Sequence, residues 1–136
     1  MLELVTTEEA RQQLRLDDPD SDGGPDDGWL AIWIPAVSEA VASWLKDRWR
    51  LYLPSRDSND DVILDSDEIP VPEVDSNGNP IIHPIVRAAV LVELASQYRF
   101  REGEGDNRVE AHEGYGYTLS KTATALLSGL RKSTVA

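Results

Sequence analysis

The 136-residue sequence contains no cysteine, one phenylalanine, one methionine and two histidines. Without cysteine, neither a disulfide framework nor a thiolate metal site can form, so stability must come from packing. This absence fits a protein that stays inside a cell or a particle. No segment approaches the roughly 20 apolar residues that span a bilayer, and residues 1–5 lack the basic and apolar regions of an export signal. We therefore expect a soluble protein with no membrane partner.

Positive charge is also scarce, because 25 acidic residues face 13 basic ones and the formal net charge is −12. Residues 1–80 carry −13, from 19 acidic and 6 basic side chains, whereas residues 81–136 carry +1, from 6 and 7. An acidic surface repels phosphate backbones, which argues against a protein that grips nucleic acid. It does not argue against a protein past which DNA slides, and a role in solubility alone is the simpler alternative.

The length and a hydrophobic content of 40% support a single domain, residues 1–136, with one modest core. Thr6 or Thr7, followed by two glutamates, predicts the capped start of a short helix that ends near Leu16. Residues 17–28 then form a loop rich in aspartate and glycine. This loop matches the first half of an EF-hand calcium loop but lacks its closing glutamate, so a solvated acidic connector is the favoured interpretation.

A long second helix is predicted over residues 29–49, where apolar side chains recur at spacings of three and four. Pro35 lies inside this pattern and should kink the helix or mark the start of its regular part. The helix carries four tryptophans, which are Trp29, Trp33, Trp44 and Trp49. We expect Trp33 and Trp44 in the core, and at least one tryptophan in contact with a neighbouring subunit.

Residues 51–82 differ from the rest, since prolines punctuate short apolar pieces and residues 75–79 are a strong turn signal. The expected product is a short β-hairpin or an extended arm between the second and third helices. Its prolines and charges suit an edge ribbon, or a loop that contacts a neighbour, better than a central strand. We find no internal repeat in the sequence.

A third helix is predicted over residues 84–102, and it is apolar on nearly every side through its first three turns. Such a helix must be enclosed by other helices, by neighbouring subunits or by both, so we expect Leu91 and Leu94 to be buried. Its polar end, residues 98–102, is a candidate contact between subunits. There we expect Arg101 to meet an acidic partner.

A last helix is predicted over residues 120–132 with Ser120 as its N-cap, so that residues 119–136 form a C-terminal helix and tail. The expected fold class is mainly α, a small bundle of about four helices with the arm between the second and third. We also expect that removal of residues 119–136 leaves a folded protein.

No group of residues has the spacing of a catalytic or metal site. His83 and His112 have no third ligand or nucleophile at a recognisable spacing. There is no Gly-x-Ser-x-Gly elbow, and the Gly-Tyr-Gly-Tyr of residues 114–117 lacks the preceding strand and the following Gly-Lys of a phosphate loop. We therefore expect no enzymatic activity, no cofactor and no metal.

The order of these elements resembles that of the tailed-phage head-tail connector (adaptor) proteins. The similar segments are residues 7–17, 26–30, the Pro-Ile-Val-Arg-Ala-Ala-Val-Leu of 84–91, the Tyr-Arg-Phe-Arg-Glu of 98–102 and the Ala-Leu-Leu-Ser-Gly-Leu-Arg of 125–131. The likeness covers most of the chain except residues 51–82. Two positions depart from the family pattern: Gly129 stands where the family often has proline, and Pro35 is unusual.

The resemblance implies a structural virion protein, made in the bacterial host cytoplasm, that forms a ring beneath the portal in the neck of the particle. Such a ring, usually of twelve copies, joins capsid to tail, and DNA passes through its lumen without specific binding. The implied partners are further copies of the chain, the portal protein and the next neck or tail-completion protein. The candidates for portal docking are Leu126, Leu127, Leu130, Arg131 and Lys132, and those for the subunit interface are Tyr98, Arg101, Glu102, Trp29 and Trp49. The folded protein that remains after removal of residues 119–136 is then expected no longer to join capsids.

A different class of function fits the same charge, namely a small acidic helical module that binds a partner or regulates by mimicking DNA. Its acidic side chains would then form the binding face. A persistent monomer that ignores portals would favour this second class.

Overall fold

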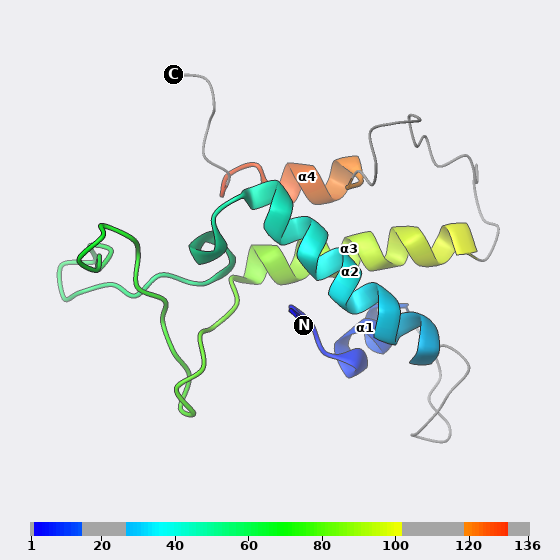
Figure 1. The fold of residues 1–136 in the computed structure, drawn as a ribbon, viewed down its shortest axis with the longest axis horizontal. Helices are drawn as coiled ribbons and strands as arrows, with labels where there is room; N and C mark the ends of the chain where they lie inside the picture. Colours follow the sequence, from blue (N-terminus) through cyan, green and yellow to red (C-terminus); the bar gives the residue numbers. More distant parts are fainter. Residues whose placement is uncertain (1, 15–26, 102–118, 131–136) are drawn as a thin grey trace.

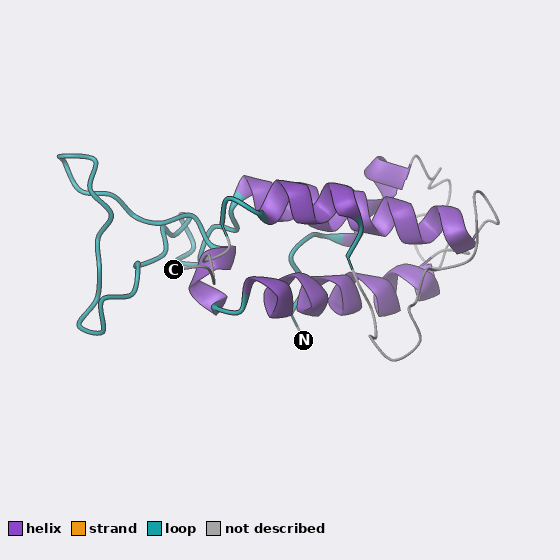
Figure 2. Cartoon of the chain, turned by 90° about the horizontal axis from the view of Figure 1, so that it is seen from above, coloured by secondary structure: helices purple, strands orange, loops and turns teal. Residues whose placement is uncertain are grey.

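The computed structural model describes residues 2–14, 27–101 and 119–130. Within these ranges the helices are α1 (Thr7–Leu14), α2 (Asp27–Leu45), a short 3-10 helix η1 (Arg48–Leu51), α3 (Pro84–Arg101) and α4 (Lys121–Leu127). In Figure 1, α2 crosses α3, and α1 and α4 lie on opposite sides of α3. The view from above in Figure 2 shows a non-helical segment that projects beyond one end of the helices. The predicted mainly α fold is confirmed.

The core lies where α3 meets the other three α-helices. On α3 the fully buried apolar residues are Val86, Ala89, Val90 and Leu94. The other helices contribute Ala10, Leu30, Ile34, Val37, Val41, Ala42, Leu45, Ala123 and Leu127. Leu94 is buried as predicted, whereas Leu91 is only partly buried at the edge of the core. Helices of the same chain therefore cover much of the apolar surface of α3, although Ile85 remains 39% exposed.

Helix α1 begins with a reciprocal cap. The hydroxyl oxygen of Thr6 accepts the backbone N–H of Glu9 at 3.0 Å, and Glu9 Oε1 accepts the backbone N–H of Thr6 at 3.0 Å. This capping box satisfies two N–H groups near the start of the helix, and it identifies Thr6 as the cap between the two threonines predicted. The second carboxylate oxygen of Glu9 pairs with Arg87, which ties α1 to α3.

The Glu9 carboxyl group makes stability depend on pH. Burial raises its pKa, but the hydrogen bonds from Arg87 and Thr6 together outweigh that effect and hold the pKa below its ordinary value. A carboxyl group whose pKa is lowered by folding stabilises the protein above its unfolded pKa, and this contribution is lost as the pH falls through the folded pKa.

Glu9→Gln is therefore expected to lower the free energy of unfolding at pH 7 by about 0.5–1 kcal/mol, the scale of a surface ion pair. The difference from the native chain should shrink as the pH falls below the ordinary pKa of a glutamate, about 4.3, and through the lower pKa that Glu9 has in the fold. Urea unfolding at pH 7 and at a pH below this range measures the difference in the free energy of unfolding. The matched control is Glu8→Gln, because Glu8 is exposed. If Glu9→Gln lost the same free energy of unfolding at neutral and at acidic pH, the ionised carboxylate of Glu9 would not be the source of the stabilisation.

Helix α2 runs from Asp27 through Pro35, whose side chain is buried, so this proline does not mark the start of the regular helix. The helix ends at Leu45 rather than at residue 49, because Lys46 adopts a left-handed φ of +74° and η1 follows. Among the described helices, α2 is long and apolar enough to cross a membrane by length and composition, a property that we did not predict. Core helices of soluble proteins pass the same test, and α2 buries eight residues, most of them apolar, in this fold.

Helix α4 is shorter than predicted, since it ends at Leu127 and residues 128–130 form a turn. Ser120 caps it as predicted, with its hydroxyl oxygen accepting the backbone N–H of Ala123 at 3.2 Å. On α3, the fully buried carboxyl group of Glu93 accepts the N–H of Ser120 with both oxygens, at 3.0 and 3.1 Å. Helix α4 is thus fixed to α3 by apolar packing and by a partly buried hydrogen bond.

Residues 52–82, here termed the arm, are all described and contain no β-strand. Antiparallel pairing is limited to five isolated bridges, such as Tyr52 with Ile82 and Pro54 with Pro72. The predicted β-hairpin is therefore not shown. Proline at four positions of the arm removes N–H groups that a continuous ladder of hydrogen bonds needs.

Candidate functional site

Three turns of the arm are built in the same way. Asp57, Asp65 and Asp75 each begin a turn, and Oδ1 of each aspartate accepts the backbone N–H groups two and four residues later at 2.8–3.0 Å. The fourth residue of each turn has a left-handed φ between 61° and 81°, and these residues are Asp60, Glu68 and Gly78. An aspartate that bonds to its own backbone in this way fixes a turn without help from a core.

Backbone hydrogen bonds close two rings at the centre of the arm. In the first ring the N–H of Ser55 donates to the carbonyl of Val71, that of Val71 to Ile63, and that of Ile63 back to Ser55, at 2.8–3.0 Å. The second ring consists of Leu53, Glu73 and Ile81, at 2.7–2.8 Å. Each ring joins three segments of the chain, so the arm is a three-lobed structure whose shape is set by its main chain.

The arm is strongly acidic and exposes apolar side chains. It holds eight acidic residues and one arginine, a formal charge of −7 out of −12 for the whole chain. Four large apolar residues of the arm are well exposed, and these are Ile63, Leu64, Ile69 and Val74. Elsewhere in the described residues only Ile32, Ile85 and Leu126 are comparably exposed. Apolar side chains gathered on one projecting segment are typical of an interaction surface.

A pocket of about 290 Å³ lies at the base of the arm, beside η1 and Leu130, and is here termed the arm-base pocket. Its lining includes two arginines, Arg50 and Arg56, and two aromatic side chains, Trp49 and Tyr52, but no carboxylate. Arg50 pairs with Asp47 just outside the lining, whereas Arg56 bonds a backbone oxygen, so the excess positive charge of this pocket comes from Arg56.

Arg50 is held in a fixed position at this pocket. Its guanidinium carbon lies 4.3 Å from the centre of the Trp49 ring. Its Nε donates to Asp47 at 3.1 Å, and its Nη1 donates to the backbone oxygen of Leu130 at 2.6 Å. These contacts, together with a side-chain exposure of 12%, place a positively charged group rigidly at the pocket wall.

His83 lines the same pocket but serves the fold. Its Nδ1 accepts the backbone N–H of Ile85 at 3.2 Å, at the start of α3. Burial lowers the pKa of its imidazole, so the ring is neutral at pH 7. In the described parts of the chain, no group of three histidine, aspartate or glutamate residues could hold a metal ion.

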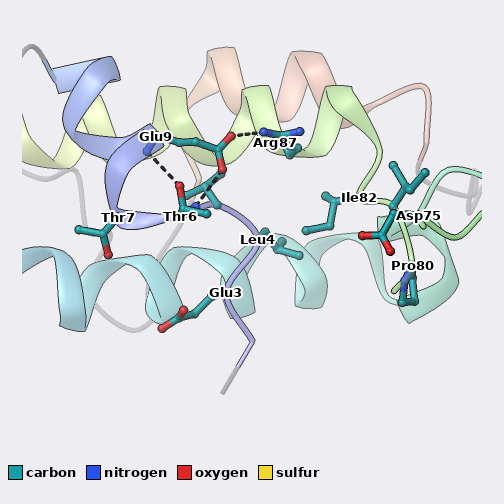
Figure 3. A pocket seen from close by; sticks show the side chains of 11 residues that line it. Glu3, Leu4, Thr6, Thr7, Glu9, Asp75, Pro80, Ile82 and Arg87 are labelled. Atoms are coloured by element: carbon teal, nitrogen blue, oxygen red, sulfur yellow. Dashed lines mark hydrogen bonds and ion pairs between the residues drawn. The ribbon is translucent and has the colours of Figure 1, made fainter. Parts of the chain in front are cut away.

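A second pocket, of about 520 Å³, lies between the N-terminal segment, α1, the start of α3 and the arm (Figure 3). Its charged lining residues are Glu3, Glu9, Asp75 and Arg87. Glu9 and Arg87 pair with each other, and Asp75 holds the third turn of the arm. In the described lining, no nucleophile is paired with a base.

The residues predicted to dock on the portal do not share one surface. Leu127 is fully buried in the core, Leu126 is 36% exposed, and Leu130 is partly buried against the core. Arg131 and Lys132 lie outside the described residues. Leu126 is thus the described member of this group that a partner can reach most easily.

The aromatic residues predicted at the subunit interface make contacts within the chain. Trp29 packs edge-to-face on Tyr98, with ring centres 5.3 Å apart, and stacks on Trp33 at 5.6 Å. Trp49 lies against Arg50, as described above. Trp33 and Trp44 pack against the core but are only half-buried, which corrects the expectation that both lie within it.

Several predicted features fall outside the described residues. These are the side chain of Arg101, Glu102, most of the acidic loop 17–28, His112 and the Gly-Tyr-Gly-Tyr of residues 114–117.

Comparisons with protein-family models, with curated proteins and with solved structures found no match to the chain. The described residues define a class by their geometry alone: a small helical body that carries a projecting acidic arm.

The sequence analysis did not predict the turns at residues 57–61 and 65–69. It also found no internal repeat, whereas the three turns of the arm are a short repeated motif. A signal was present, because Asp-Ser followed by Asn or Asp begins each turn, at residues 57, 65 and 75. The arm-base pocket left no comparable signal. Its lining comes from segments as far apart as Trp49 and Leu130, which only the fold brings together.

Proposed function

We propose that this chain is a structural virion protein, a head-tail connector (adaptor) that forms a ring under the portal of a tailed phage and joins the capsid to the tail. The observation that carries this proposal is the arm. It is acidic, shaped by its own main-chain hydrogen bonds, and projects from a helical body that has its own apolar core. A segment of this kind is available for contacts with other subunits.

The charge of the chain supports the same proposal. A ring through which DNA passes must not hold the phosphate backbone, and an acidic surface that faces the lumen meets this requirement. The partners in this proposal are further copies of the chain, the portal protein and the next neck or tail-completion protein. DNA passes through without specific binding.

The geometry of the pockets supports a structural rather than a catalytic role. In the described pockets, Glu9 caps a helix and pairs with Arg87, Asp75 holds a turn, and Arg50 pairs with Asp47. No nucleophile, base and orienting group converge there. A connector needs no such group, because its task is to hold two assemblies together.

The test uses portal-containing capsids that lack neck proteins, taken from the phage that encodes the chain. The tagged full-length protein is mixed with these capsids and separated from unbound protein on a glycerol gradient. We expect it to sediment with the capsids, and electron microscopy should show added density at a single vertex. Protein that stays at the top of the gradient, with an unchanged vertex, would overturn the proposal and favour the small acidic binding module.

A matched pair of variants locates the docking surface. Leu126→Asp places a charge on the exposed face of α4 and is expected to lower the bound fraction at least tenfold, the change that a loss of about 1.4 kcal/mol produces. Ile32→Asp makes the same change at an exposed position of α2, and this variant is expected to bind normally. Equal binding by both variants would exclude α4 as the docking element.

A further inference from the structure

The turn at residues 65–69 differs from the other two turns of the arm in what it presents to solvent. Asp65 is occupied by its own backbone, but Asp67 and Glu68 are exposed and make no hydrogen bond through their side chains within the described residues. Leu64 and Ile69 flank them, at exposures of 52% and 38%. The turn thus presents two carboxylates between two aliphatic side chains.

The other turns do not offer this combination. The turn at 75–79 has Asn77, Gly78 and Asn79 after its aspartate and therefore no further carboxylate. The turn at 57–61 has Asp60 and Asp61, but it is flanked on one side by Arg56 rather than by an aliphatic side chain. The turn at 65–69 is accordingly the best candidate for insertion into a basic, partly apolar pocket.

The arm-base pocket has the complementary chemistry. It presents the exposed Arg56, which has no carboxylate partner among the described residues, and the fixed guanidinium of Arg50, which Asp47 already pairs. The aromatic side chains of Trp49 and Tyr52 lie beside them. Carboxylates pair with guanidinium groups, and aliphatic side chains are covered by aromatic faces. Its volume of about 290 Å³ suits a few side chains rather than a whole helix.

A chain cannot place its own turn in its own pocket without breaking the arm. The rings through Ser55, Ile63 and Val71 fix the lobe, and the arm that carries it projects beyond one end of the helices (Figure 2). The same rings mean that little chain entropy is lost when the turn docks elsewhere. A second copy of the chain supplies both the acidic turn and the basic pocket.

We propose that the turn at residues 65–69 of one copy docks in the arm-base pocket of another copy, with Asp67 and Glu68 facing Arg50 and Arg56. Because the two surfaces differ, the contact is head-to-tail and can repeat from copy to copy until a ring closes. This inference deepens the proposed function and rests on it for ring closure. The contact itself is tested on the purified chain.

The absence of cysteine makes a crosslinking test direct. Ser66→Cys marks the turn, and Gly129→Cys marks the pocket rim beside Leu130, where a new Cβ meets no atom within 4 Å. The two variants carry tags of different mass and are mixed in equal amounts under mild oxidation. The control pair is Ser66→Cys with Ile32→Cys, which places the second thiol at an exposed position of α2.

We expect the Ser66→Cys and Gly129→Cys pair to form mixed disulfides at least about tenfold faster than the control pair, as a contact worth ~1.4 kcal/mol would produce. Arg56→Glu in the Gly129→Cys copy should remove the difference, and Asp67→Lys in the other copy should restore it. Equal rates for both pairs, or a predominance of dimers between two Ser66→Cys copies, would overturn the contact. Docking on capsids is measured separately, so a failure here leaves the proposed function standing.

Discussion

Replacing Leu94 with alanine is expected to lower the free energy of unfolding by about 3 kcal/mol, within the range measured for buried leucines. Leu94 is fully buried on α3, among apolar side chains from the other helices. The substitution removes their contacts and leaves a cavity that the surrounding helices fill only in part. Urea unfolding followed by circular dichroism gives the midpoint and the slope.

Leu91→Ala is the matched control, because it removes the same atoms from the same helix at a partly buried position. Its expected cost is about 1 kcal/mol, in proportion to the smaller area that it removes from water. If both variants lost the same amount of stability, α3 would not be oriented with Leu94 toward the core.

Removal of residues 119–136 is expected to cost more than a single leucine-to-alanine change, which costs roughly 2–5 kcal/mol. The truncation takes away Ala123 and Leu127, both fully buried, and leaves Glu93 without the N–H of Ser120. A buried polar group that loses its partner adds its own penalty. This expected loss of stability argues against the expectation from the sequence that the chain without residues 119–136 is a folded protein.

The control for the truncation is Leu126→Ser, which keeps α4 in place and changes an exposed side chain. Its expected effect is about 0.5 kcal/mol or less. Thermal unfolding of both variants measures the difference. A truncated chain that unfolds cooperatively at the midpoint of the full chain would mean that α4 adds no stability.

The helices could be predicted because their apolar spacing follows directly from the helical repeat. Their ends were less predictable. Nothing local distinguishes Lys46, which ends α2 in a conformation that non-glycine residues rarely adopt. Ser120 was predicted correctly as a cap, because capping depends on residues a few positions apart.

The arm and its pocket were harder to predict for a physical reason. The turns are local, and the aspartates that begin them stand in the sequence. The rings instead join residues such as Leu53 and Ile81, whose pairing no periodic pattern records. The role of Glu93 was also hidden. The N–H group that its buried carboxylate accepts belongs to Ser120, which is 27 positions away in the sequence.

The two backbone rings at the centre of the arm have a consequence for evolution. Because main-chain atoms form them, selection can replace residues at the tips of the lobes, apart from the aspartates that hold the turns, without disturbing the scaffold. A lineage of such proteins could therefore change its partners one lobe at a time while the helical body stays constant. In the proposed connector, the residues that determine specificity would thus be separate from those that determine folding.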